Sequence, residues 1–185
     1  HGRPSISCTR RQSNPRRQRR RNAPLTSKMN NQDCIFCKIV AGEAPCDKIW
    51  EDEKHLAFLS IYPNTEGFSV VVTKEHYPSY VFDLSENVYA ELLLAARKVG
   101  KLLDSAFEDV GRTGLMLEGF GVDHVHAKLF PMHGTASKTW VKRNSTLDKY
   151  FENYEGYISS HDSKRADDGK LIALAEKIRT HARGF

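Results

Sequence analysis

The segment Asp123–Pro131 alternates polar with small or apolar residues at a period of two. His124, His126 and Lys128 take one set of alternate positions. Because successive side chains of a strand point to opposite faces, this pattern predicts a strand with one buried face. It also predicts that both imidazoles and the ammonium project from the same face, roughly 6–7 Å apart at each step. A solvated strand edge would explain one such histidine, but three groups in register favour a surface that handles phosphate.

The composition predicts one folded domain preceded by a basic tail. The chain has 185 residues, of which 39% are hydrophobic, and no apolar run is long enough to span a bilayer. Residues 1–28 hold nine basic residues and no acidic one; since the whole chain carries +5, residues 29–185 carry −4. We expect residues 1–28 to be a disordered tail or a leader sequence, and residues 29–185 to be one domain with a C-terminal extension from about residue 139.

The cysteines indicate a reducing compartment. There are four in the chain, and the sequence shows no secretory signal, so we expect a cytoplasmic location without membrane contact. Cys34 and Cys37 form a Cys-x-x-Cys pair. On spacing alone this pair fits a redox site, half of a zinc site, or two buried cysteines.

The remaining pattern predicts an α+β fold with a mostly antiparallel sheet. Apolar residues recur at three and four spacing from Glu86 to about Phe107, which predicts a long helix capped by Ser85. A short helix from Cys34 to Ala41 and a last helix from Asp167 to Ala182 are also expected. The apolar stripe expected on the last helix consists of Leu171, Ile172, Leu174, Ala175 and Ile178. The expected strands are Lys48–Glu51, His55–Ser60, Phe68–Lys74, Gly114–Glu118 and His124–Met132.

Four segments in collinear order resemble the histidine triad (HIT) superfamily of hydrolases and transferases. They cover about a hundred residues, and the last one matches the signature His-φ-His-φ-His-φ-φ. These segments are Cys34–Glu43, Trp50–Leu59, Gly67–His76 and His124–Pro131.

The resemblance implies a five-stranded antiparallel sheet with a long helix, and a homodimer with one site in each subunit. It implies chemistry at the α-phosphorus of nucleotide conjugates. His126 is then the nucleophile, with His124 and Lys128 as the other catalytic candidates. A neutral imidazole is available near pH 7, and a nucleotidyl-histidine intermediate would be released by water. No metal is needed for this chemistry.

The resemblance also implies a structural zinc site. Some members complete the cysteine pair with two histidines, and by alignment these are His76 and His124. With Cys34 and Cys37 they form a Cys₂His₂ set, which suits tetrahedral Zn²⁺ with every position filled by protein. The alternative is a metal-free set of buried polar residues.

The chain departs from the family pattern where the substrate would bind. Lys128 replaces the third histidine, and an ammonium there would lower the pKa of the neighbouring imidazoles. Ser60 stands where the family has an aspartate that grips the ribose. Gly121 stands where many members have a serine that donates to the leaving group. The candidate substrate-binding residues are Phe58, Ser60, Gly119, Gly121 and Asp123.

These residues favour a hydrolase of nucleotide-like phosphoanhydrides or phosphoramidates that acts through His126. The alternative is a zinc-stabilised nucleotide-binding protein with little turnover. A third hypothesis, nucleic-acid binding, would rest on residues 1–28 alone, and a steep salt dependence would mark it.

Overall fold

The computed structural model describes residues 33–142 and 164–181. The tail 1–28 and most of the expected C-terminal extension lie outside these ranges. In chain order the elements are α1 (Ile35–Ala41), β1 (Lys48–Glu51), β2 (His55–Leu59), β3 (Ser69–Thr73), η3 (Val81–Asp83), α2 (Glu86–Ala106), β4 (Thr113–Met116), β5 (His126–Pro131) and α3 (Asp168–His181).

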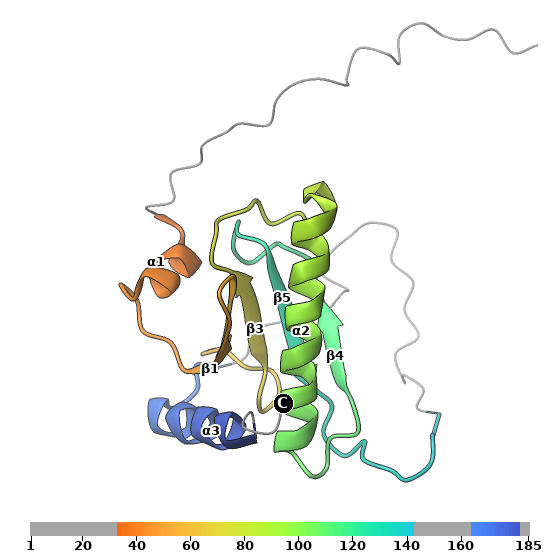
Figure 1. The fold of residues 1–185 in the computed structure, drawn as a ribbon. Coiled ribbons are helices and arrows are strands. Elements are labelled where there is room, and N and C mark those ends of the chain that lie inside the picture. Colours follow the sequence, from red (N-terminus) through yellow and green to blue (C-terminus); the bar gives the residue numbers. More distant parts are fainter. Residues whose placement is uncertain (1–32, 143–163, 182–185) are drawn as a thin grey trace, which may run out of the picture.

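The five strands form one antiparallel sheet in the order β1-β2-β3-β5-β4, which confirms the α+β class. Every residue of β2 and β3 is buried, and their alternate apolar side chains lie in two clusters, one shared with α2 and α3 and the other with Phe36 of α1. The helix α2 crosses one face of the strands, and α1 lies to the left of the strands in Figure 1, on the side away from β4.

The helix α2 begins as predicted. The Ser85 hydroxyl accepts a hydrogen bond from the Val88 backbone N–H at 3.5 Å, which satisfies one of the free donors of the first turn. The side chains at three and four spacing are buried against the sheet, and they form the larger apolar core together with α3. The buried residues of α2 are Leu92, Ala95, Ala96, Val99, Leu102, Leu103 and Ala106.

The opposite face of the sheet carries a smaller apolar cluster under α1. Phe36 of α1 packs there with Phe58 of β2 and with Val70 and Val72 of β3. The helix α1 ends at Gly42, whose φ of 77° is a left-handed conformation that favours glycine; its N–H closes the last turn on the Ile39 carbonyl at 3.1 Å.

Two details correct the sequence prediction. The strand β5 begins at His126 and not at His124, because the Val125 N–H bonds the Tyr77 carbonyl at 2.9 Å instead of joining the sheet. On α3, Ile172 was expected in the apolar stripe, but it is 52% exposed while Leu171, Ala175 and Ile178 are buried.

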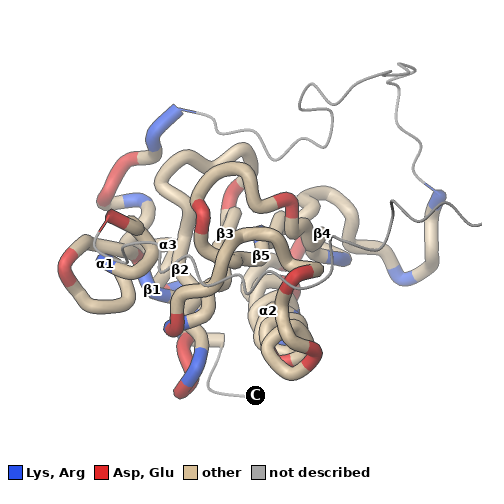
Figure 2. The backbone as a smooth tube through the Cα atoms, turned by 90° about the horizontal axis from the view of Figure 1, so that it is seen from above, with Lys and Arg blue, Asp and Glu red and all other residues tan. Residues whose placement is uncertain are grey.

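Figure 2 views the backbone from above, with α2 on one side of the strands and the acidic positions spread over helices and loops. Within the ranges 33–142 and 164–181, no helix has both the length and the apolar character needed to cross a bilayer.

Candidate active site and metal cluster

The strand β5 sends alternate side chains to the two faces of the sheet. His126 pairs with Val72 and Lys128 with Val70, both of which belong to the cluster under α1. The residues between, Ala127 and Leu129, face α2. The strand pattern therefore places His126 and Lys128 on one face, as expected, and that face carries α1.

His126 is held in one tautomer. Its Nδ1 lies 2.7 Å from the His124 carbonyl oxygen, so Nδ1 carries the proton that it donates and Nε2 keeps a free lone pair. The Phe36 ring and the imidazole pack in a T-shaped arrangement, with centroids 5.2 Å apart. Burial lowers the pKa of His126, and the Lys128 charge lowers it further against the opposing effects of the His124 carbonyl and Glu118. The ring is therefore neutral and nucleophilic near pH 7.

His126 is only 2% exposed, yet it lines a cavity of about 430 Å³. That volume lies within the range of roughly 300–1,000 Å³ found for small-molecule sites. The walls come from α1, β2, β3 and the loop before β5, and they are mostly aliphatic and aromatic. Lys128 and His126 lie together on the β5 side, and Ser60 lies on the β2 side.

Lys128 forms an ion pair with Glu118. Both side chains are largely buried, with 12% of the lysine and 10% of the glutamate exposed. The ammonium also lies near Gly121, since a Cβ built on that glycine would be 3.8 Å from Nζ. The Lys128 ammonium therefore lies beside Gly121, on the same face of the sheet as His126, and it is paired with the Glu118 carboxylate.

The structure separates the candidate substrate-binding residues into two groups. Phe58, Ser60 and Gly121 line the cavity together with His126. Asp123 instead accepts the Ser79 backbone N–H at 2.9 Å. Gly119 adopts a φ of 73° and touches the same residue, since a Cβ there would lie 2.7 Å from the Ser79 carbonyl oxygen. Gly119 and Asp123 thus fix the loop, and neither lines the cavity in the described part of the chain.

The structure brings the four candidate metal ligands together. One donor atom from each of Cys34, Cys37, His76 and His124 lies within 4.8 Å of all the others. Cys34 Sγ and Cys37 Sγ are 3.4 and 3.6 Å from His124 Nδ1, and Cys37 Sγ is 3.4 Å from His76 Nδ1. These three distances fall within the range of about 3.3–3.8 Å that separates ligands about 2.0–2.3 Å from a tetrahedral ion, so the cluster is a candidate site for one ion.

The protonation states agree with that spacing. His124 Nε2 lies 2.8 Å from the Thr73 carbonyl oxygen and must donate to it, which leaves Nδ1 free to face the thiols. Burial, reinforced by His76 and His126, lowers the pKa of His124 to about 4, so the ring is neutral at pH 7. Burial and the neighbouring Cys34 raise the pKa of the Cys37 thiol to about 11. A cation between the two sulfurs would favour the thiolates that these surroundings otherwise disfavour.

Three contributors to the site were not predicted from sequence as functional residues. Glu118 pairs with Lys128, Thr73 orients His124, and Phe36 packs on His126. The signal for Phe36 is its place inside the Cys-x-x-Cys segment. Glu118 could be identified only once the register of β4 and β5 is known. In that register Met116 pairs with Lys128, so Glu118, two residues after Met116, lies close enough to pair with the lysine.

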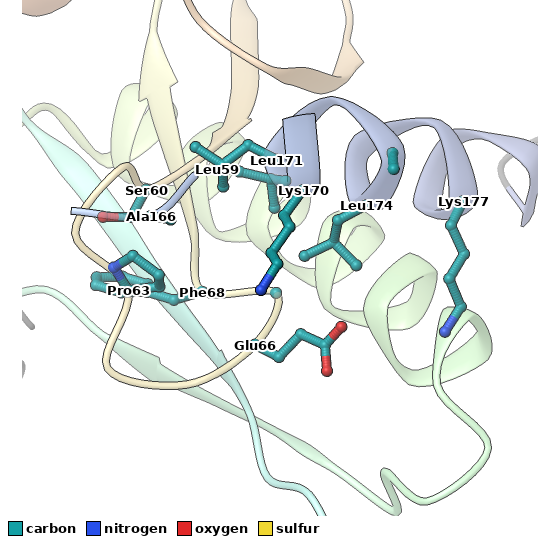
Figure 3. A pocket seen from close by; sticks show the side chains of 12 residues that line it. Leu59, Ser60, Pro63, Glu66, Phe68, Ala166, Lys170, Leu171, Leu174 and Lys177 are labelled. Atoms are coloured by element: carbon teal, nitrogen blue, oxygen red, sulfur yellow. The ribbon is translucent and has the colours of Figure 1, made fainter. Parts of the chain in front are cut away.

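A larger cavity of about 610 Å³ lies between α3 and the loop that joins β2 to β3 (Figure 3). Its charged side chains are Lys170, Lys177 and Glu66. The described residues that line it include no imidazole and no thiol. The cavity at His126 is therefore the candidate active site.

Comparison with known proteins identifies the family. Residues 41–135, half of the chain, match the HIT domain model. The protein hit of Bacillus subtilis is 31% identical over 138 residues, which cover 72% of this chain and 94% of the relative. An adenosine 5′-monophosphoramidase of Schizosaccharomyces pombe is 38% identical over 98 residues, covering 53% of this chain and 73% of the relative.

A solved structure has the same fold at low sequence identity. It is that of a Zn-bound histidine triad family protein from Mycobacterium smegmatis, with a TM-score of 0.60, 21% identity, and coverage of 83% of this chain and 96% of that one. The collinear match, the five-stranded sheet and the histidine strand agree with one another. The chain therefore belongs to the HIT domain family.

Proposed function

We propose that the protein hydrolyses nucleotide-like phosphoramidates or phosphoanhydrides at the α-phosphorus, with His126 as the nucleophile. The name of the Schizosaccharomyces pombe relative, an adenosine 5′-monophosphoramidase, supports this reaction class. The observation that carries the proposal is the tautomer of His126, whose Nδ1 donates to a carbonyl and whose free Nε2 belongs to a ring that lines a ligand-sized cavity.

The reaction would run in two displacements. In the first, His126 Nε2 bonds to phosphorus while the bond from phosphorus to the leaving nitrogen or oxygen breaks, and the leaving group takes a proton from solvent. In the second, water bonds to phosphorus, the bond from Nε2 to phosphorus breaks, and a proton returns to solvent. Lys128 would neutralise phosphate oxygens in both steps, where alignment and charge stabilisation dominate.

Trapping the intermediate tests this proposal. The protein should be incubated with adenosine 5′-phosphoramidate labelled at phosphorus, quenched within one turnover, and analysed by mass spectrometry for an adenylyl group on His126. We expect the adduct on the wild type and on the control His181→Ala, which changes an exposed histidine at the end of α3. Turnover without any adduct on His126 would contradict the covalent mechanism.

One observation favours the alternative, a nucleotide-binding protein with little turnover. Lys128 shares its charge with Glu118, which reduces the charge that it offers to a phosphate. This alternative predicts that adenosine monophosphate binds tightly, while neither phosphoramidates nor dinucleoside polyphosphates are consumed. The same trapping experiment separates the two functions.

We further propose that Cys34, Cys37, His76 and His124 hold a structural Zn²⁺. The donor set, its tetrahedral spacing and the oriented His124 ring support this site. The ion would fix α1 to His124, two residues before β5, and the His124 carbonyl would in turn hold His126. The Zn-bound histidine triad family protein from Mycobacterium smegmatis, which has the same fold, is consistent with such a site.

Metal analysis of matched cysteine variants tests the zinc site. We expect about one zinc per chain in the wild type and in Cys46→Ser, which changes a cysteine outside the cluster. Cys34→Ser and Cys37→Ser should both lose the metal, together with thermal stability. A wild-type protein purified without zinc and unable to take it up would end the proposal.

We also propose that two copies form a homodimer. The strand β4 is an edge strand that pairs only with β5 in the described sheet, and its Leu115 is 48% exposed. An unpaired edge with an exposed apolar side chain readily associates with another chain. Light scattering should give twice the chain mass, and Leu115→Glu should shift it toward the monomer.

A further inference from the structure

We propose that the cavity at His126 selects its substrate by the phosphate and the apolar base, and that the ribose hydroxyls contribute little. Phosphoramidates of 2′,3′-dideoxynucleosides would then be processed about as well as those of ribonucleosides. This inference rests on the proposed hydrolase function, because it names the substrate range of the same site. It follows from the chemistry of the cavity walls.

The phosphate end of the cavity is polar and cationic. His126 and Lys128 come from the same strand and provide the nucleophile and the positive charge. Lys128 carries a positive charge that it shares with Glu118, which does not itself line the cavity. The described residues of the lining include no carboxylate. The cavity therefore favours an anion beside β5.

The rest of the cavity is shaped for an apolar ring. Phe58, Phe68 and Val70 form part of the wall, and Ile35 and Ile61 remain 45% and 38% exposed where they border the space. Large apolar side chains that stay exposed around a cavity become covered when a ligand ring fills it, which removes apolar area from water. A nucleobase has the flat apolar faces that such a wall accommodates.

Away from β5, the described lining offers a ribose diol only neutral groups, among them the hydroxyls of Ser60 and Tyr62, and no carboxylate. Nucleotide sites commonly bind ribose hydroxyls through an aspartate or glutamate, because a carboxylate accepts both hydrogen bonds and strengthens them with its charge. Ser60 is the polar residue on the β2 wall, and its hydroxyl oxygen accepts the Tyr62 backbone N–H at 3.2 Å. The O–H donor and one lone pair of Ser60 remain available, but neutral hydrogen bonds from a single hydroxyl to the sugar would be weaker than those of a carboxylate.

The loop that carries Ser60 cannot readily supply a carboxylate in its place. Its one acid, Glu66, lines the other cavity, beside α3 (Figure 3). Both ends of this loop are held by backbone bonds, from Ser60 N to Phe68 O at 2.9 Å and from Ala166 N to Ile61 O at 2.8 Å. Glu66 therefore belongs to the cavity beside α3 and does not line the cavity at His126.

Matched substrates test the inference. We expect kcat/KM for adenosine 5′-phosphoramidate and for its 2′,3′-dideoxy analogue to agree within about threefold, whereas sites built around a substrate hydroxyl reject the analogue by about 10⁴-fold. Ser60→Asp should create a preference for the ribonucleotide of about tenfold or more. A wild-type preference above about tenfold would overturn the inference and leave the hydrolase proposal intact.

A binding experiment separates the two proposals if no phosphoramidate is consumed. Titration calorimetry on the full chain should then compare adenosine monophosphate with 2′,3′-dideoxyadenosine monophosphate. Dissociation constants within about threefold would support the sugar-independent cavity although the hydrolase proposal fails. A tenfold advantage for adenosine monophosphate, or no binding of either nucleotide, would overturn the inference.

Discussion

The same strands form both faces of the sheet, but one face is closed by a packed core and the other borders a cavity. On the α2 face, the cluster is continuous from β2 to α3, and residues such as Leu103 and Val99 have no exposed surface. On the α1 face, the apolar cluster is smaller and opens into the cavity of about 430 Å³. One face is closed by packing, and the other is left open where His126 lies.

The difference arises within a single strand. Ala127 and Leu129 of β5 extend the closed core, while His126 and Lys128 reach the open face. Burial of apolar area stabilises the domain on the first face. On the second face, burial lowers the pKa of His126 and so keeps this imidazole, the proposed nucleophile, neutral. The comparison predicts that substitutions on the two faces separate activity from stability.

The largest effect is expected for His126→Ala. Loss of the nucleophile should lower kcat/KM by about 10⁴-fold or more, since no other described imidazole lines the cavity. The free energy of unfolding should fall by only about 1 kcal/mol. Steady-state hydrolysis and urea unfolding measure the two quantities on the same protein. A variant that keeps a tenth of the wild-type rate would break the comparison.

The matched change on the closed face is Leu129→Ala. Leu129 is 2% exposed and packs in the α2 core, so truncation should lower the free energy of unfolding by about 2–4 kcal/mol. The rate at saturating substrate should change by less than about threefold, because the β5 backbone and His126 stay in place. Urea unfolding and kcat at low temperature provide the measurements. A large loss of kcat in folded protein would show that the two faces are coupled.

Much of the fold could be predicted from sequence because its signals are local. The spacing of apolar residues in α2 and the Ser85 cap specify that helix within one residue of its observed end. The start of β5 could not be predicted in this way. Whether His124 joins the strand depends on the bond from Val125 N to the Tyr77 carbonyl, and that bond links segments far apart in the chain.

The candidate site shows the same limit. The cysteine and histidine ligands were predicted through a family resemblance, and the structure places their donor atoms together. Asp123 was expected near the substrate, but it holds Ser79 instead, because the tight turn at Gly119 brings that loop against Ser79. Glu118 was not predicted at all, since its role depends on the pairing of β4 with β5.

A substitution at Lys128 should lower both kcat and the free energy of unfolding, so it sharpens the comparison of the two faces. Lys128→Met removes a charge beside His126 and should lower kcat by about 10–100-fold. It should also cost about 2 kcal/mol of stability, since Glu118 loses its ion-pair partner while only 10% of its side chain is exposed. The double variant Lys128→Met/Glu118→Gln should recover stability without recovering the rate. If it recovers both, the lysine acts only by neutralising Glu118.

The smallest effect is expected for His133, whose pKa shifts in the direction opposite to that of His126. Burial lowers its pKa, but the Glu66 carbonyl and the Asp109 carboxylate together outweigh that effect, and the net shift is upward from 6.5. Asp109 has its pKa lowered, first by the bond to His133 and then by the Gly134 N–H. A raised histidine pKa stabilises the fold below its unfolded value and loses that contribution as the pH rises through the folded value.

A pH series on His133→Gln tests that contrast. A lowered carboxyl pKa stabilises the fold above its unfolded value of 3.8 and loses the contribution as the pH falls through the folded value. The wild type should therefore exceed His133→Gln in stability most clearly between about pH 4 and pH 6.5, and the difference should shrink at higher pH. Urea midpoints at half-unit pH steps measure this difference in stability. Glutamine is the chosen replacement because it keeps hydrogen-bonding capacity but cannot carry the charge. A difference independent of pH would mean that His133 acts through its hydrogen bonds to Glu66 and Asp109 alone, and that the charge of the pair adds nothing to stability.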